Sequence, residues 1–428
     1  MHKPHSPLKI SNTAKTVGVK EHLANVDDDF CDVNEKGGEC GSKGSSLNLR
    51  YIFYDVNPPE GFNLRRDVYM RMAGFIKKLN QDVNSYLVLP PWSHLYHWQS
   101  DDIKGQTRLP WSTFFDIETL QSYAPVIEMR DFFETGIKMI DQVYVLQHFE
   151  DTFTSGNFED RMKIEPCLAK IRYRRAGDAY EGYFWDFRNV TSKKVDCLSY
   201  HGPAVKLADV LKMSEARTIM FDHAEVALHD RFGDKEYWDA RKSMKFAQHL
   251  IEEAENYQTK YLNWKRELHA NPWPNAVRNA TGGPYLAAHV RRKDFLYGHK
   301  KTVPSLDGVA KHIDRACERL GLDTVFVATD APKEEKRELI KKLPKRKVFM
   351  YDPSEEVRAK WKDGGIAIIE QIICSNARYF IGTHESTYSF TIREEREIMG
   401  FEPKTTFQRF CGDEEKNCEP PTRRLIVH

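Results

Sequence analysis

The second half of the chain alternates between the two spacings of apolar residues that mark strands and helices. Short apolar runs predict strands at 284–290, 325–329, 348–351 and 379–381. Apolar residues three and four positions apart predict helices at 305–320, 333–342, 364–377 and 387–399. Strands separated by helices in this way predict an α/β domain with a parallel, doubly wound sheet, whose ligands bind beyond the carboxyl ends of the strands.

The first half contains a sparser version of the same pattern. It predicts strands at 51–56, 86–89 and 142–147, a helix whose apolar face runs from Leu64 to Leu79, and a long charged helix over 237–268. Pro272 and Pro274 break that last helix and mark a linker. Residues 1–48 are too polar to fold alone. We therefore expect a tail (1–48) and two α/β domains (49–272 and 273–428).

Polar residues stand where the predicted strands end. The first strand leads through Pro59 to Glu60, Gly61 and Asn63, and a strand, a glycine turn and a helix start present backbone N–H groups to an anion. Glu60 is either a base held where the two domains meet or a solvated turn carboxylate.

The strand at 284–290 leads into His289-Val290-Arg291-Arg292-Lys293-Asp294. Alternation sends His289 and Arg291 to one side of the sheet, and a guanidinium there can bind a diphosphate. Asp294 can orient that arginine. The alternative is an exposed basic edge.

Two further positions are candidates for binding a nucleotide. Ser386 and Thr387 are expected to cap the terminal helix, whose N-terminus is a ready phosphate site. Glu370 lies within an apolar helix, where a carboxylate needs a partner, either a guanine base or an internal cation. Plain capping and an internal salt bridge remain the alternatives for these positions.

The composition is that of an ordinary globular protein, with 40% hydrophobic, 12% aromatic and 30% charged residues. The formal net charge of +1 gives no global attraction to nucleic acid or anionic lipid, so we expect neither as a partner. No apolar run approaches the roughly 18 residues that a membrane-spanning helix needs, and we expect no membrane span.

Cysteine spacing points to disulfides rather than to metal. No CxxC pair occurs, which argues against zinc ribbons and thioredoxin-type sites. Cys167 and Cys197 bracket about thirty residues, Cys411 and Cys418 bracket a short charged loop, and both pairs are typical of disulfide-closed loops. The other four cysteines are interpreted as two buried thiols, Cys317 and Cys374, and two tail residues of open pairing, Cys31 and Cys40.

Sequons at Asn189 and Asn279 fit the oxidising compartment that disulfides require, and we expect glycosylation there. The first twenty residues contain no apolar core of a signal peptide, which argues the other way. The balance favours a secretory-pathway protein.

Five sequence blocks resemble the GDP-fucose protein O-fucosyltransferase family. In order they read YDVNPPEGFNLRRD, LPPWSHLYHWQ, HVRRKDF, VFVATDA and FIGTHESTYSF. HxRRxD with the two later blocks marks the wider fucosyltransferase superfamily. The first two blocks resemble the branch that modifies thrombospondin type 1 repeats rather than epidermal-growth-factor-like repeats.

The resemblance implies a GT-B fold, in which two Rossmann-like domains face each other across a central cleft. The first would carry the catalytic turn on the acceptor side, and the second would bind GDP-fucose. It implies Glu60 as the catalytic base and Arg291 as the arginine that meets the diphosphate. Further donor contacts would come from Pro59, Gly61, Phe62, Asn63, His289, Glu370, Ser386, Thr387 and Tyr388. The family's paired cysteines match Cys167 with Cys197 and Cys411 with Cys418.

The implied reaction transfers fucose, with inversion, to a Ser or Thr hydroxyl of a folded thrombospondin repeat in the endoplasmic-reticulum lumen. The only DxD triplet is Asp27–Asp29 in the tail, so we expect no divalent metal and no other cofactor. Two alternatives stay open: a fucosyltransferase for another folded repeat or glycan acceptor, and a non-catalytic nucleotide-sugar-binding quality-control module. The second should lack Glu60 or Arg291, and both are present.

Overall fold

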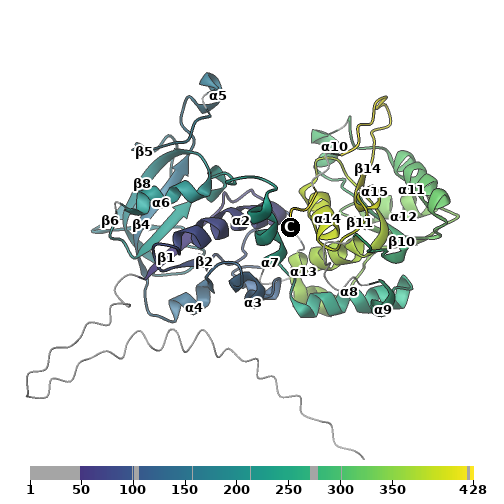
Figure 1. The fold of residues 1–428 in the computed structure, drawn as a ribbon, viewed down its shortest axis with the longest axis horizontal. Helices are drawn as coiled ribbons and strands as arrows, with labels where there is room; N and C mark the ends of the chain where they lie inside the picture. Colours follow the sequence, from purple (N-terminus) through teal and green to yellow (C-terminus); the bar gives the residue numbers. More distant parts are fainter. Residues whose placement is uncertain are drawn as a thin grey trace, which may run out of the picture.

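Two β-sheets, each covered by helices, lie side by side in the molecule (Figure 1). The computed structural model describes residues 49–98, 100, 106–156, 158–212, 214–269, 278–299, 301–421 and 425–428. The predicted tail, with Asp27–Asp29, Cys31 and Cys40, and the predicted linker lie outside the described residues.

The first sheet has nine strands among the described residues, in the order β3-β2-β1-β9-β4-β8-β7-β6, with β5 paired to β8. The strands are β1 (Arg50–Tyr54), β2 (Ser85–Leu89), β3 (Val126–Glu128), β4 (Met139–Gln147), β5 (Arg161–Glu165), β6 (Tyr173–Ala176), β7 (Ala179–Gly182), β8 (Thr191–His201) and β9 (Thr218–Asp222). β1 pairs in parallel with both β2 and β9. The carboxyl ends of β1 and β9 therefore open together, where the strand order reverses and where doubly wound sheets bind ligands.

Helices cover this sheet and join its strands. They are α2 (Phe62–Leu79), η1 (Trp111–Thr113), α3 (Ile117–Gln121), α4 (Met129–Phe133), α5 (Thr152–Ser155), η2 (Ala204–Leu207), α6 (Ala208–Lys212), η3 (Ala224–Val226) and α7 (Lys235–Ser243). In α2, Val68, Met72 and Ile76 are fully buried, as the apolar spacing predicted. Gly61 occupies the N-cap position of α2 and leaves the helix N-terminus without a side-chain cap.

The single long helix predicted over 237–268 is wrong. The chain forms α7, then α8 (Gln248–Tyr261) and α9 (Arg266–His269). The break has a tertiary cause, because the intervening backbone bonds to another segment: Asp116 N–H donates to Lys245 O at 3.0 Å, and Ala247 N–H donates to Phe114 O at 2.9 Å. Beyond the break, α8 packs along α13 (Glu355–Ser375) of the other half of the molecule.

The second sheet is wholly parallel, with the order β12-β11-β10-β13-β14. Its strands are β10 (Gly283–Val290), β11 (Thr324–Thr329), β12 (Lys347–Phe349), β13 (Ala377–Gly382) and β14 (Gln408–Arg409). Besides α13, its helices are α10 (Phe295–Gly298), α11 (Leu306–Leu320), α12 (Lys333–Lys342), α14 (Thr387–Ile398) and α15 (Pro403–Thr406). Numbered within this half the order is 3-2-1-4-5, the Rossmann order, with its reversal between β10 and β13.

Helix α13 begins earlier than predicted, because Ser354 caps it and the helix continues across a kink at Lys362, where φ is +59°. Just after the kink, Gly364 allows the two halves to approach closely. A Cβ there would lie 2.5 Å from the Trp98 ring and 2.8 Å from Phe114, both of the first half.

The predicted disulfides and buried thiols are confirmed within the described residues. Disulfides join Cys167 to Cys197 and Cys411 to Cys418. Cys317 and Cys374 are buried free thiols. Among the described residues no helix has the length and apolar character needed to span a membrane.

Candidate active site

Glu60 stands on a tight turn at the carboxyl end of β1. Its N–H donates to Asn57 O at 3.0 Å, which closes the turn. Arg65, from the first turn of α2, binds the same backbone: its Nε donates to Glu60 O at 3.1 Å and its Nη2 to Pro58 O at 3.3 Å. The carboxylate of Glu60 is half-buried and has no hydrogen-bond partner among the described residues. Burial, followed by the nearby Glu225 carboxylate, raises the pKa of Glu60, and Arg65 opposes this rise.

Gly61 and Phe62, the next two predicted donor contacts, are both packed against aromatic or imidazole rings. Phe62 is buried, with its ring 4.7 Å from that of Trp92 and 5.6 Å from that of Phe114. Gly61 lies against His97, because a Cβ at Gly61 would approach the imidazole to 3.2 Å. Trp92 is therefore a core residue, whereas His97 lies beside the turn.

Arg291 leaves the carboxyl end of β10 and is held by two carboxylates. Its Nη2 lies 2.5 Å from Asp294 Oδ1, and its Nη1 lies 2.8 Å from Asp330 Oδ2. Arg292 turns the other way and pairs with Glu335 at 2.7 Å, as strand alternation predicted. The guanidinium of Arg291 is thus fixed in position while its side chain stays 16% exposed.

The imidazole of His97 connects the Glu60 turn and this arginine. His97 Nδ1 lies 3.4 Å from Arg291 Nη2, and the same ring packs against Gly61. Glu60 and Arg291 each follow a strand at the reversal point of its sheet, and the carboxyl ends of these two strands, β1 and β10, lie on either side of His97. The structure therefore brings together the predicted base and the predicted diphosphate-binding residue, which are 231 positions apart in the chain.

His289 is buried next to Arg291, and side chains of α14 contact its ring. Its Nδ1 lies 2.8 Å from Ser389 Oγ, and its ring stacks on Tyr388 at 4.4 Å. Thr383 joins the two strand ends, since its hydroxyl donates to His289 O and accepts from Arg291 N–H, both at 2.9 Å. Burial, and secondarily Arg291, lowers the pKa of His289 to about 3, so this imidazole is neutral.

The capping role predicted for Ser386 and Thr387 is wrong. Ser386 occupies the N-cap position of α14, but no side chain caps this helix. The hydroxyl that satisfies the loop is that of Ser389, which accepts from Thr383 N–H at 3.0 Å. Thr387 is exposed at the first position of the helix. The N–H groups of the first turn are consequently left for a ligand or water.

Glu370 is half-buried on α13 and forms no hydrogen bond with any described residue. Burial, with a smaller contribution from Asp330, raises the pKa of Glu370 to about 8, although Lys336 and Arg358 oppose the shift. No internal cation neutralises this carboxyl at short range. The salt-bridge alternative is therefore wrong for the described structure, and the group is available to a ligand.

Asn63 joins the two halves. Its Oδ1 accepts from Arg66 Nη1 at 3.2 Å, on its own helix, and from Gln371 Nε2 at 3.1 Å, on α13. Asn63 also lines, with Thr387, a cavity of about 190 Å³ between α2, α7 and α14. The predicted donor contacts of both halves thus border the same interdomain region.

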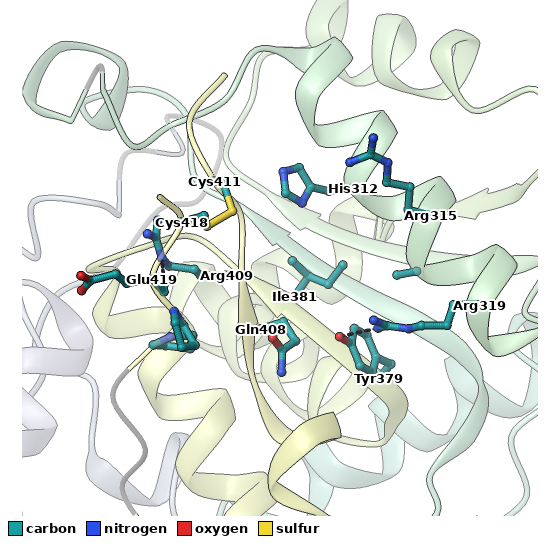
Figure 2. A pocket seen from close by; sticks show the side chains of 13 residues that line it. His312, Arg315, Arg319, Tyr379, Ile381, Gln408, Arg409, Cys411, Cys418 and Glu419 are labelled. Atoms are coloured by element: carbon teal, nitrogen blue, oxygen red, sulfur yellow. Dashed lines mark hydrogen bonds between the residues drawn. A yellow bond between two sulfur atoms is a disulfide. The ribbon is translucent and has the colours of Figure 1, made fainter. Parts of the chain in front are cut away.

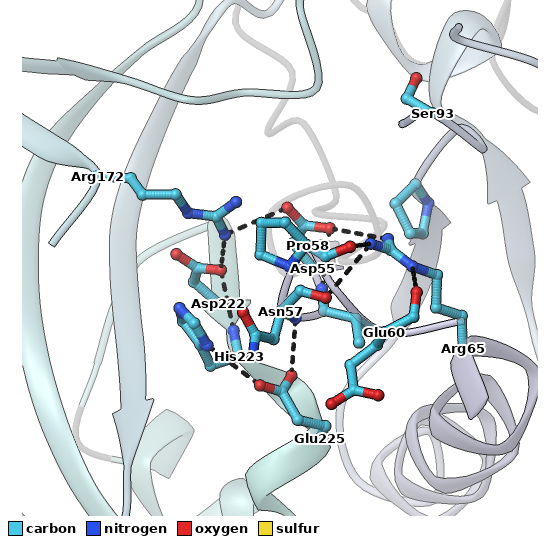
Figure 3. Close-up of polar contacts among 12 residues, drawn as sticks. Asp55, Asn57, Pro58, Glu60, Arg65, Ser93, Arg172, Asp222, His223 and Glu225 are labelled. Carbon is cyan, nitrogen blue, oxygen red and sulfur yellow. Dashed lines mark hydrogen bonds and ion pairs between the residues drawn. The ribbon is translucent and has the colours of Figure 1, made fainter. Parts of the chain in front are cut away.

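A buried acidic network supports the turn from behind (Figure 3). Arg172 Nη2 lies 2.6 Å from Asp222 Oδ1 and 3.4 Å from Asp55 Oδ2, at the ends of β9 and β1. Burial and the neighbouring Asp222 carboxylate raise the pKa of Asp55 to about 6, although Arg172 and Arg65 lower it. Arg172 follows Cys167 in the chain, so the disulfide to Cys197 restrains the segment that supplies this cation.

Other predicted positions lie away from this region. Asn189 and Asn279 are exposed. A cavity of about 290 Å³ is lined on one side by the Cys411–Cys418 disulfide and on the other by Arg315 and Arg319 (Figure 2). None of the predicted donor-binding residues lines it. Within the described ranges, no group of three or more His, Cys, Asp or Glu side chains is arranged to hold a metal ion.

Sequence reasoning missed several residues of the site. Asp222 is the last residue of the buried strand β9, and His223 and Glu225 follow it. The strand sequence TIMFD has the same strand-exit signature as the others. His97 stands in the LPPWSHLYHWQ block, but its contact with Arg291 could not be predicted, because that contact joins the two halves of the molecule.

Comparison with known proteins agrees with this geometry. The family model of the GDP-fucose protein O-fucosyltransferases matches residues 51–399. The chain is 47% identical over 395 residues to GDP-fucose protein O-fucosyltransferase 2 of Homo sapiens, covering 90% of this chain and 91% of that protein. It is 40% identical over 394 residues to the protein of the same name from Caenorhabditis elegans, covering 89% and 90%.

Crystal structures of POFUT1 in complex with GDP and with GDP-fucose share the fold. The GDP complex superimposes with a TM-score of 0.56 at 17% identity and covers 85% of this chain and 98% of its own. The GDP-fucose complex superimposes with a TM-score of 0.56 at 16% identity and covers 86% of this chain and 99% of its own. The expected GT-B arrangement of two Rossmann-like halves is confirmed. With its family motifs gathered at one interdomain site, the chain belongs to the GDP-fucose protein O-fucosyltransferase family.

Proposed function

We propose that this enzyme transfers fucose from GDP-fucose to a Ser or Thr hydroxyl of a folded thrombospondin type 1 repeat, with inversion and without a divalent metal. The observation that carries the proposal is the convergence of Glu60 and Arg291, with His97 between the turn and the guanidinium. A proton acceptor and a diphosphate-binding cation on facing edges are what a single displacement at a sugar–phosphate bond requires.

The donor would lie on the second half. Arg291 and the uncapped N–H groups of α14 would hold the diphosphate, while Glu370 would accept from the N1–H and amino group of guanine. His289 and Tyr388 would support this surface from below. Binding of guanine should draw the pKa of Glu370 down from its raised value, because hydrogen bonds to the charged form favour it.

In the transfer step the acceptor oxygen attacks C1 of fucose from the face opposite the diphosphate. The C1–O bond to phosphate breaks with its electron pair going to GDP, the new C1–O bond forms, and the hydroxyl proton passes to Glu60. The raised pKa of Glu60 suits it to take that proton. Arg291 and the helix N-terminus stabilise the charge that develops on the leaving diphosphate, which is the role a metal ion plays in other transferases.

A protein acceptor fits the surface beside the turn. The loops after β4 emerge at the same carboxyl edge as Glu60 and form a projection around α5 (Figure 1). Phe153 in α5 and Phe158, between α5 and β5, are 75% and 61% exposed. Large apolar side chains exposed on a projection of this kind support a protein-binding surface. The two disulfides and the exposed sequons at Asn189 and Asn279 support glycosylation and a location in the endoplasmic-reticulum lumen.

The test is fucose transfer from GDP-fucose to one thrombospondin repeat, offered folded or reduced, with and without EDTA. We expect transfer to the folded repeat alone, undiminished by EDTA, and an α-linked product by NMR. Glu60→Gln should bind GDP-fucose with unchanged affinity in calorimetry and lose turnover by at least about 100-fold, as for removal of a general base. Near-normal turnover of this variant would refute Glu60 as the base. Rescue of an EDTA-treated enzyme by Mn²⁺ would refute transfer without a divalent metal.

A further inference from the structure

A second carboxylate, Glu225, lies beside the catalytic turn. Glu60 follows β1 and Glu225 lies in η3, immediately after β9, the strand paired with β1. Figure 3 shows both carboxylates on the same side of the turn, with the Arg65 guanidinium on the other. The electrostatic effect of Glu225 on Glu60 agrees with this placement.

Glu225 is fixed by two hydrogen bonds. Its Oε2 accepts at 3.1 Å from the N–H of Asn57, which is the first residue of the turn. Its Oε1 lies 3.1 Å from His223 Nδ1. The side chain of Glu225 is 19% exposed, so its pair with His223 is only partly hydrated. Arg65 binds the carbonyl end of the same turn. Glu225 and Arg65 therefore hold the Glu60 backbone from opposite ends, while the Glu60 carboxylate is left free.

Four other groups carry the charges around Glu60 and Glu225: Arg65, Arg172, His148 and His223. Arg65 of α2 faces backbone carbonyls and Asp55, and Arg172 is paired with Asp222. His148, after β4, feels the Glu225 charge, and the hydrogen bond with Glu225 raises the pKa of His223. Among the described groups near the Glu60 carboxylate, the cations are thus committed to other partners, and Glu225 is the anion that acts on it.

We propose that Glu225 is a positioning residue for fucosyl transfer: it anchors the Asn57–Glu60 turn, and its negative charge favours proton uptake by Glu60, with His223 moderating that charge. The inference rests on the proposed role of Glu60 as the base. Two carboxylates in one partly buried site make one of them the stronger proton acceptor. When His223 is protonated, its positive charge offsets that of Glu225 and weakens Glu60 as a base.

The test compares kcat/KM against pH for three variants. Glu225→Gln keeps an oxygen for Asn57 N–H but removes the charge, so the acidic limb should move to lower pH by about 0.5–1 unit and the plateau should fall about 5–20-fold. His223→Asn removes the imidazolium and suits the left-handed backbone there, where φ is +59°. Its acidic limb should move to higher pH. Glu215→Gln, the same change at an exposed position, should match the unmodified enzyme.

The opposite shifts separate this role from a merely structural one. If Glu225→Gln lowers the plateau of kcat/KM but leaves the midpoint of the acidic limb unchanged, Glu225 only holds the turn and the inference is overturned. If Glu225→Gln fails to fold, judged by its melting curve, His223→Asn decides alone, and an unshifted or lowered midpoint rejects the inference. Near-normal turnover of Glu60→Gln refutes the proposed base itself, whereas an inactive Glu60→Gln with unshifted variants refutes only this inference.

Discussion

His289 makes the site sensitive to acid in a way that a surface histidine would not. Its side chain is 5% exposed and its Nδ1 lies within hydrogen-bond distance of Ser389 Oγ. Arg291 stands two residues further along the chain, on the same side as His289. A protonated imidazole there would be both desolvated and repelled by the guanidinium. The fold therefore holds the ring neutral, and the surface that would receive the nucleotide depends on that state.

We expect stability to fall as pH drops below 6.5. The pKa of His289 is about 3 in the folded protein and about 6.5 when unfolded, so between these values the unfolded chain binds more protons. The linked slope is at most about 1.4 kcal/mol per pH unit. Urea unfolding at about pH 7 and about pH 4.5 should show a loss for the unmodified protein that is about 2 kcal/mol greater than for His289→Gln. Equal losses would mean that other groups dominate the acid sensitivity.

At the scale of elements, the start of α14 combines two demands. No side chain caps its first-turn N–H groups, which leaves them free for the diphosphate of the proposed donor, yet the loop from Thr383 to Ser386 is buried at both ends and must satisfy its backbone. Ser389, one turn into the helix, resolves this by accepting from Thr383 N–H and contacting His289. The serine at the N-cap position can therefore remain uncommitted.

Two serine-to-alanine changes test this division. Ser389→Ala should cost about 1–3 kcal/mol, because it leaves the buried Thr383 N–H and His289 Nδ1 without partners. Ser386→Ala should change stability by less than about 0.5 kcal/mol, since its hydroxyl caps nothing. Denaturant unfolding of the pair measures both. A larger loss for Ser386→Ala would show that it is the true cap.

The whole molecule depends on how its halves are joined. Arg241 of α7 is 2% exposed and crosses to α14, where it lies 3.0 Å from Glu394 Oε2 and 2.9 Å from Glu395 Oε2. Together with the Asn63–Gln371 bond and the packing of α8 on α13, this contact fixes the distance between the carboxyl ends of β1 and β10. Positioning of Glu60 relative to Arg291 is therefore a property of the interface.

Arg241→Ala should destabilise the protein by about 3–5 kcal/mol, because Glu394 and Glu395 would remain at the interface without their cation. Turnover should fall as the halves separate, and small-angle scattering should report a larger radius of gyration. Arg174→Ala is the control, since its ion pair with Glu181 is exposed and worth at most about 1 kcal/mol. An Arg241→Ala enzyme with unchanged stability and turnover would place the fixing of the interface elsewhere.

The sequence by itself determined the elements whose signal lies in neighbouring residues. The strands β10 to β13, the helices α11, α12 and α14, the amphipathic face of α2 and the strand-exit positions of Glu60, His289 and Arg291 all follow from local periodicity. The motifs at those exits were enough to indicate the chemistry, because parallel strands deliver their carboxyl ends to one edge.

Tertiary structure alone decided what depends on distant contacts. The break before α8 follows from backbone bonds to residues 114–116, and the hydroxyl that satisfies the α14 loop is chosen by where Thr383 and His289 lie. The meeting of His97 with Gly61 and Arg291, and of Glu225 with Asn57, joins residues up to 194 positions apart. Periodicity within a helix or strand carries no information on such pairs, because they form only when separate elements pack together.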